Sequence, residues 1–164
     1  LLTEVDVAMP YRVELHNPGA DAVDLEGWYI YWVTPTEDGY TELPAFTLDP
    51  GAYVYMVDDV PNPMSPAYVD GQGVIHIQNI NWAEDEAGAC YLFSPLGSVG
   101  VDFVRWGSAD FVPALPDTWE DTPNLLSPIP TGSTLGRSNL TDTDTAADWC
   151  LMPATLGDAN DPCN

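Results

Sequence analysis

Short segments in which hydrophobic and polar residues alternate recur along the chain. In residues 11–17, YRVELHN, Val13 and Leu15 fall on one side of an extended strand, whereas Arg12 and Glu14 fall on the other. Alternation with a period of two residues is typical of a β-strand that buries one face. This segment therefore predicts a strand that packs its valine and leucine into a core.

Similar segments follow one another at spacings of about ten residues, separated by proline and glycine. We predict strands in residues 1–7, 11–17, 22–33, 46–59, 73–80, 89–95 and 101–107, with a last strand near Trp149. No segment shows the period of an amphipathic helix longer than two turns. Many short strands and no helix predict an all-β fold, a sandwich or barrel of short antiparallel strands.

Two proline-rich stretches, residues 60–73 and residues 108–132, interrupt this rhythm. We predict two long loops there. Long loops on a rigid scaffold often carry binding sites, although such an insertion can also serve only to cover the edge of a sheet.

Charge narrows the possible partners. The 164 residues include 26 acids, three arginines and no lysine, for a net charge of −23. Such a field repels nucleic acids and anionic membranes, and it favours calcium, cationic partners or a salty medium. No run of 18 apolar residues is present, so we expect no membrane insertion.

The length fits a single domain over residues 1–164, and the 45% of hydrophobic residues suffice for a core. Because the first residue is leucine in a predicted strand, we expect the chain to be a fragment of a longer protein.

The three cysteines are Cys90, Cys150 and Cys163. We favour a disulfide between Cys150 and Cys163, which would stabilise the fold by about 3 kcal/mol, with Cys90 left as a buried thiol. The alternatives are three reduced thiols in a cytosolic protein or a bridge through Cys90. With no C-x-x-C pair and only two histidines, His16 and His76, the sequence shows no structural zinc pattern.

Four segments resemble the lamin tail domain family, and they follow one another in the order expected for that family. They are ELHNPGADAVDLEGWYI (14–30), FTLDPGAYV (46–54), VDFVRWG (101–107) and STLGRSNLTDTDTAADWCLMPATLGDAN (133–160). They match an E-L-x-N-P turn, a V-D-L-x-G-W strand, an L-x-P-G turn and a closing S-L-x-R…D-T-D…A-D-W…T-P-G-x-x-N run. The chain departs from this pattern by an inserted threonine in STLGR, by ATLG in place of T-P-G, and by the long stretch 108–132.

The resemblance implies an immunoglobulin-like β-sandwich without catalytic machinery. Nuclear lamins use such domains to bind partner proteins, and bacterial members look like accessory modules of secreted or surface proteins. The acidic charge and the expected disulfide favour the bacterial, secreted setting, hence an extracellular or cell-surface location. They also argue against any DNA-binding role.

Several residues of these motifs are expected to determine the fold. Asn17 and Gly51 belong to turns that set strand register, and Gly27 allows a bend before Trp28 enters the core. We expect Arg137, one of only three cations, to pair with a carboxylate such as Asp144 or Asp148 and so to pin the last strands together.

The run TDTDTAAD raises the question of a metal site. Asp142, Asp144 and Asp148 are hard oxygen ligands close together in sequence, so calcium is one hypothesis for this loop. The glycine and glutamate positions of an EF-hand loop are not met. The alternative is that these aspartates are solvated or cap turns, and that the run is scaffold.

Aromatic residues offer a further hypothesis. Trp32, Trp82 and Trp119, together with Tyr31 and Tyr40, fall at predicted strand ends or in loops and could form a platform for sugar rings. The alternative is that they fill the core.

No nucleophile–histidine–acid order or phosphate-binding glycine loop is present, and we do not predict an enzyme. The histidines lie in predicted strands, where structural roles are expected. We therefore predict a non-catalytic interaction or structural module of an extracellular protein, which binds a protein and requires no cofactor. The alternatives are a carbohydrate-binding module that holds a polysaccharide on exposed aromatics, and an adhesion module stabilised by calcium.

Overall fold

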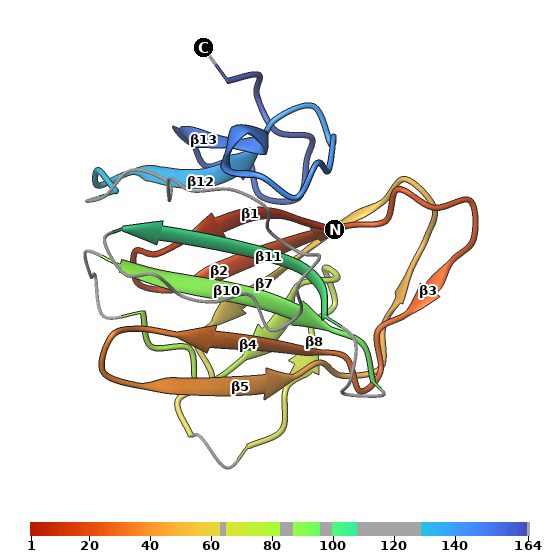
Figure 1. Ribbon diagram of the computed structural model, residues 1–164. Helices are drawn as coiled ribbons and strands as arrows, with labels where there is room; N and C mark the ends of the chain where they lie inside the picture. Colours follow the sequence, from red (N-terminus) through yellow and green to blue (C-terminus); the bar gives the residue numbers. More distant parts are fainter. Residues whose placement is uncertain (63–64, 83–86, 96–99, 108–128, 164) are drawn as a thin grey trace.

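The computed structural model describes residues 1–62, 65–82, 87–95, 100–107 and 129–163. Within these ranges the chain is almost entirely β-structure, with one 3-10 turn, η1 (Ala146–Asp148), before the last strand (Figure 1). The predicted fold class, an all-β sandwich, is confirmed. No helix in the described part of the chain is both long and apolar enough to cross a bilayer.

The larger sheet contains seven strands in the order β13-β12-β1-β2-β7-β9-β8. Their bounds are β1 (Leu2–Asp6), β2 (Arg12–His16), β7 (Tyr53–Asp58), β8 (Tyr68–Val69), β9 (Ile75–Ile77), β12 (Ser133–Arg137) and β13 (Trp149–Pro153). All neighbours are antiparallel except β7 and β9, which are parallel. This pair departs from the expected antiparallel arrangement, because the chain between β7 and β9 is long enough for the crossover that parallel strands need.

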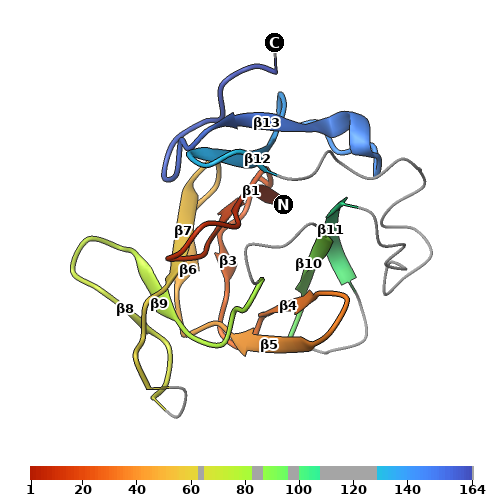
Figure 2. The ribbon, with the colours of Figure 1, turned by 90° about the vertical axis from the view of Figure 1, so that its left-hand side faces the viewer.

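The second sheet has the order β11-β10-β4-β5, and a two-stranded ribbon pairs β3 with β6. Their bounds are β3 (Val23–Asp24), β4 (Tyr29–Val33), β5 (Asp38–Glu42), β6 (Thr47–Leu48), β10 (Ala87–Phe93) and β11 (Gly100–Gly107). Figure 2 shows β7 and β9 on one side of the molecule and β10 and β11 on the other. The two main sheets thus enclose the interior between them.

The predicted strand 22–33 is two strands in the structure. A turn at Glu26 and Gly27 separates β3 from β4, and Gly27 has a φ of +75°, a conformation that costs glycine little. Trp28, directly after this turn, is partly buried and packs against the core.

The core is filled by the inward-facing residues that alternation predicts. Val13 and Leu15 on β2, and Ile30 on β4, are almost completely buried. Trp106 on β11 and Trp82 are buried as well, and their rings meet edge to face with centroids 5.7 Å apart.

The two predicted turns have the expected geometry. The buried side chain of Asn17 donates from Nδ2 to the backbone oxygens of Asp21 and Leu48, both at 2.9 Å, and its Oδ1 accepts from the N–H of Gly19. Gly51 has a φ of +74° between β6 and β7. These contacts fix the register of the strands on either side.

The first of the two predicted proline-rich loops, residues 60–73, contains strand β8, which pairs with β9 at the edge of the large sheet. Of the second, residues 108–132, only residues 129–132 lie within the described part of the chain.

The predicted disulfide is present. Cys150 in β13 is bonded to Cys163 near the C-terminus. Cys90 in β10 is a buried free thiol, as expected, and burial raises its pKa well above the ordinary value.

The segment that follows β13 is fastened to β1 and β2 through two buried carboxylates. Glu4 accepts hydrogen bonds from the backbone and hydroxyl of Thr155, and Glu14 accepts from the backbone of Gly157. Asn160 donates from Nδ2 to the backbone oxygen of Thr3 at 2.6 Å. The C-terminal segment is therefore an integral part of the large sheet's surface.

Candidate functional site

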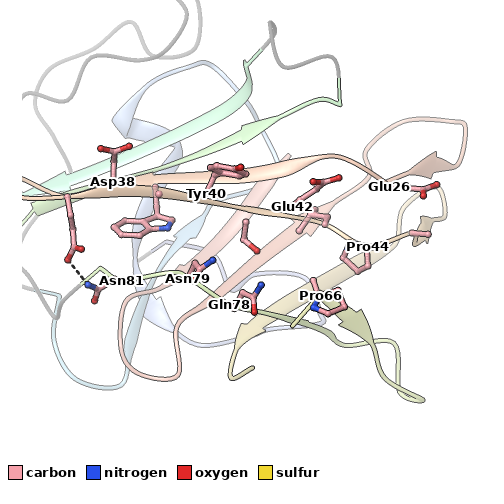
Figure 3. Close-up of a pocket in the computed structure, with 16 residues that line it drawn as sticks. Glu26, Asp38, Tyr40, Glu42, Pro44, Pro66, Gln78, Asn79 and Asn81 are labelled. Carbon is pink, nitrogen blue, oxygen red and sulfur yellow. Dashed lines mark hydrogen bonds between the residues drawn. The ribbon is translucent and has the colours of Figure 1, made fainter. Parts of the chain in front are cut away.

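An open cleft of about 900 Å³ lies along β5, between this strand and the segment that follows β9 (Figure 3). This volume falls in the upper part of the range of ligand-binding pockets. One wall is formed by residues 37–45 and the other by residues 66–67, 78–79 and 81.

The indole of Trp32 belongs to the lining of the cleft. Trp32 lies on β4 opposite Gly39 of β5, and a Cβ at Gly39 would come within 2.7 Å of the indole ring. Only glycine at this position leaves the ring its place beside β5. Trp32 is 4% exposed, and its Nε1 has no hydrogen-bond partner among the described residues.

Amide side chains form the opposite wall. Figure 3 shows Gln78, Asn79 and Asn81 in a row below β5. Asn81 donates from Nδ2 to Oε1 of Glu37, which ties the two walls together at one end. The buried Oε1 of Gln78 has no partner in the described structure, like the indole nitrogen of Trp32.

The cleft is acidic. Four carboxylates, those of Glu26, Glu37, Asp38 and Glu42, contribute to its lining. None of the three arginines lies among the lining residues, and the chain has no lysine. A ligand that carries positive charge would therefore be attracted to this site.

A row of aromatic side chains lies across β10, β4 and β5. Tyr29 stacks on Phe93 with centroids 4.9 Å apart and meets Tyr40 edge to face at 6.0 Å. Tyr31 contacts Tyr91 at 5.3 Å. Tyr40 is 63% exposed, so this row reaches the surface beside the cleft.

The three tryptophans predicted as an exposed platform require a correction. Trp32 and Trp82 are 4% and 1% exposed, because both fall on inward positions of the sandwich. Neither can offer a free ring face to a sugar. Trp119 lies outside the described residues.

The aspartates predicted as calcium ligands do not converge on one point. Asp142 and Asp148 face the guanidinium of Arg137 at 2.9 and 3.4 Å, whereas Asp144 is a partly buried residue at a φ of +55°. No group of three acidic, histidine or cysteine side chains suited to a metal ion occurs in the described part of the chain. Two of the three aspartates, Asp142 and Asp148, therefore pair with Arg137, where the hypothesis placed a calcium ion.

Arg137 is the centre of this loop and is 1% exposed. Besides Asp148, which was expected, it pairs with Asp102 of β11 at 2.6 Å, and its Nε donates to the backbone oxygen of Leu2. Its guanidinium also lies 4.7 Å from the centre of the Trp149 ring. The sequence could not indicate Asp102, which is 35 residues distant and comes close only through the fold. Most of the run TDTDTAAD therefore serves to hold the fold together.

Both histidines lie in strands, as predicted. His16 contacts the backbone oxygen of Ala52. His76 lies between Asp59 at 2.7 Å and Asp70 at 3.4 Å, and the hydrogen bond with Asp59, more than that with Asp70, raises its pKa.

A scan against models of known protein families found no match, and a search of curated proteins found none either. The resemblance to lamin tail domains therefore remains a prediction.

Proposed function

We propose that the protein is a non-catalytic binding module of an extracellular or cell-surface protein, and that it holds a segment of a partner protein in the cleft beside β5. The observation that carries this proposal is the pair of buried, unpartnered groups at the cleft, the donor Nε1 of Trp32 and the acceptor Oε1 of Gln78. A buried polar group without a partner costs about 1–3 kcal/mol. A polypeptide carries both acceptors and donors along its backbone, so a segment in the cleft can supply both missing partners when the side chains of Trp32 and Gln78 turn toward it.

Two further features support the proposal. The walls of the cleft include two paired strands, β4 and β5, so the site is largely formed before a partner arrives, which reduces the ordering cost of binding. The Cys150–Cys163 disulfide is of the kind found in oxidising compartments, and the resemblance to lamin tail domains points to the same type of module.

The proposal can be tested with arrays of random-sequence peptides and of oligosaccharides, probed with the full chain. Ala45 is exposed and lines the cleft, so Ala45→Trp fills the site from its mouth; the matched control, Ala20→Trp, alters an exposed alanine that does not line it. We expect peptides to bind to the wild type and to Ala20→Trp, and we expect no binding to Ala45→Trp. Peptide binding that survives Ala45→Trp would contradict the proposed site.

A second candidate function is polysaccharide binding, favoured by the exposed ring of Tyr40 beside Tyr29. An exposed aromatic ring offers an apolar face on which a sugar ring can pack. In the same arrays, oligosaccharides that bind to Ala45→Trp but not to Tyr40→Ala would support this candidate in place of the first.

A further inference from the structure

Strand β5 is the outermost strand of its sheet in the described structure. An outermost strand exposes one row of backbone N–H and C=O groups, which can pair with a further strand. The cleft lies along this edge, so the backbone of β5 belongs to the binding site (Figure 3).

The register identifies the groups that face outward. Backbone hydrogen bonds join Leu43 to Trp28 at one end of the β4–β5 pair and Thr34 to Glu37 at the other. In an antiparallel pair, every second residue turns its backbone groups toward the partner strand. The remaining residues of β5, Asp38, Tyr40 and Glu42, therefore turn theirs toward the open edge.

The side chains of the same three residues share one face of β5 and are arranged acid, aromatic, acid. Figure 3 shows Asp38, Tyr40 and Glu42 side by side along the strand, on the side away from Gln78 and Asn79. All three residues are exposed. A strand added to this edge would place every second side chain beside this row and the alternate ones over the cleft.

We propose that the partner segment is an extended, lysine- or arginine-bearing stretch of polypeptide that pairs with the open edge of β5 as a fifth strand of the sheet. This inference rests on the proposed function and names the class of partner. Basic side chains at every second position meet Asp38 and Glu42, with the ring of Tyr40 between them available for a cation–π contact. The intervening side chains and the backbone lie over Trp32 and Gln78.

Charge complementarity is the reason to expect a basic segment in the cleft. Four carboxylates and no cation line the cleft, and the whole chain carries a net charge of −23. A second copy of the chain would bring the same negative charge to the edge, and an acidic segment would be repelled in the same way. Recognition by strand addition takes its affinity from the backbone and its selectivity from alternate side chains.

The first experiment measures binding of a fluorescently labelled hexapeptide, Lys-Thr-Lys-Val-Lys-Thr, to the full chain by fluorescence anisotropy. The same peptide with glutamate in place of each lysine is the control. We expect only the basic peptide to bind. Its affinity should fall steeply between about 0.01 M and about 1 M ionic strength, where the screening length shrinks from about 30 Å to about 3 Å.

The second experiment separates backbone pairing from side-chain contact at one position. Tyr40→Pro removes the outward N–H of β5, and an edge strand tolerates proline at such a position; Tyr40→Ala removes the ring but keeps the N–H. We expect Tyr40→Pro to bind the basic peptide at least about tenfold more weakly than Tyr40→Ala, a difference of about 1.4 kcal/mol. Thermal unfolding of both variants reports whether the fold is intact.

A third pair of variants tests the charges without altering the backbone. Asp38→Asn/Glu42→Gln removes the two acids of the row, and Asp21→Asn/Asp161→Asn removes two exposed acids that do not line the cleft, at equal net charge. We expect the first pair to lower both the affinity and its salt dependence and the second pair to leave them close to the wild type.

The outcomes distinguish this inference from the proposed function. If the basic and acidic peptides bind equally well, and Tyr40→Pro binds as tightly as Tyr40→Ala, then the partner is not a basic strand paired with β5. The proposed function, a cleft that binds peptides, would still stand. Binding of chitosan oligomers but of no peptide overturns both. Binding of the basic peptide that both pairs of charge variants leave unchanged also overturns the inference, because the acidic row then plays no part.

Discussion

At the scale of single residues, the cation predicted to pin the last strands contacts both main sheets. Arg137 joins Asp102 of one sheet, Asp148 of the loop before β13 and the backbone of β1. The sequence indicated Arg137 and one of its partners because the two lie 11 residues apart in a recognisable motif. It could not indicate Asp102, since contacts between distant segments leave no local pattern.

Arg137→Met should lower the free energy of unfolding by about 3–5 kcal/mol, because it leaves the buried carboxylate of Asp102 without its partner. Arg12→Met is the matched control: the side chain of Arg12 is 32% exposed and pairs with Asp6 at 3.5 Å, so a loss of at most about 1 kcal/mol is expected. Denaturation with urea measures both. Equal losses for the two variants would contradict the assigned role of Arg137.

Gly39→Ala should destabilise the protein by about 1–3 kcal/mol, because the new methyl group meets the indole of Trp32 at 2.7 Å in a packed core. Gly71→Ala, at a position where a Cβ meets nothing within 4 Å, should change little. Urea denaturation together with tryptophan fluorescence tests this expectation. An unchanged stability of Gly39→Ala would show that the indole has room to move.

At the scale of elements, alternation predicted where most strands lie but not how they pair. Residues 11–17 and 101–107 contain β2 and β11, as predicted, but both strands are buried on both faces, which alternation alone does not show. The parallel pair of β7 and β9, and the cleft beside β5, depend on how the crossover after β7 is placed, which no local pattern determines. Trp32 was predicted as a ligand-binding residue for its exposure, whereas the structure brings it to the cleft as a buried ring.

The burial of the Glu14 carboxyl on β2 makes stability depend on pH. Burial raises the pKa of Glu14 to about 7, so its protonated form is favoured in the folded state relative to the unfolded one. The stability that this contributes is complete below about pH 4.5, the ordinary pKa, and is lost as pH rises past about 7.

We therefore expect the melting temperature of the wild type to fall between pH 4.5 and pH 7 and the fall to be smaller in Glu14→Gln. Glu26→Gln, at an exposed position, controls for the change in net charge and should keep the wild-type slope. Thermal unfolding over this pH range measures all three. Coincident slopes for the wild type and Glu14→Gln would show that Glu14 titrates normally.

At the scale of the whole molecule, the disulfide closes the C-terminal region over a separation of 13 residues. Cys150→Ser/Cys163→Ser should lower the free energy of unfolding by about 3 kcal/mol, since the bridge restricts the unfolded chain. Cys90→Ala, which removes only a buried thiol, should cost less. A thiol assay of the unfolded, unreduced wild type should find one free sulfhydryl per chain, and three would contradict the bridge.

The position of this bridge also determines how the protein carries mechanical load. Strands β1 and β13 flank the same strand, β12, so a pull on residues 1 and 163 enters the large sheet at β1 and, through the Cys163–Cys150 bond, at β13. The tension is then borne by the hydrogen bonds among these three neighbouring strands. Strands β4 and β5, which contribute one wall of the cleft, belong to the other sheet and lie outside this path, so we expect this wall to keep its shape while the protein is under tension.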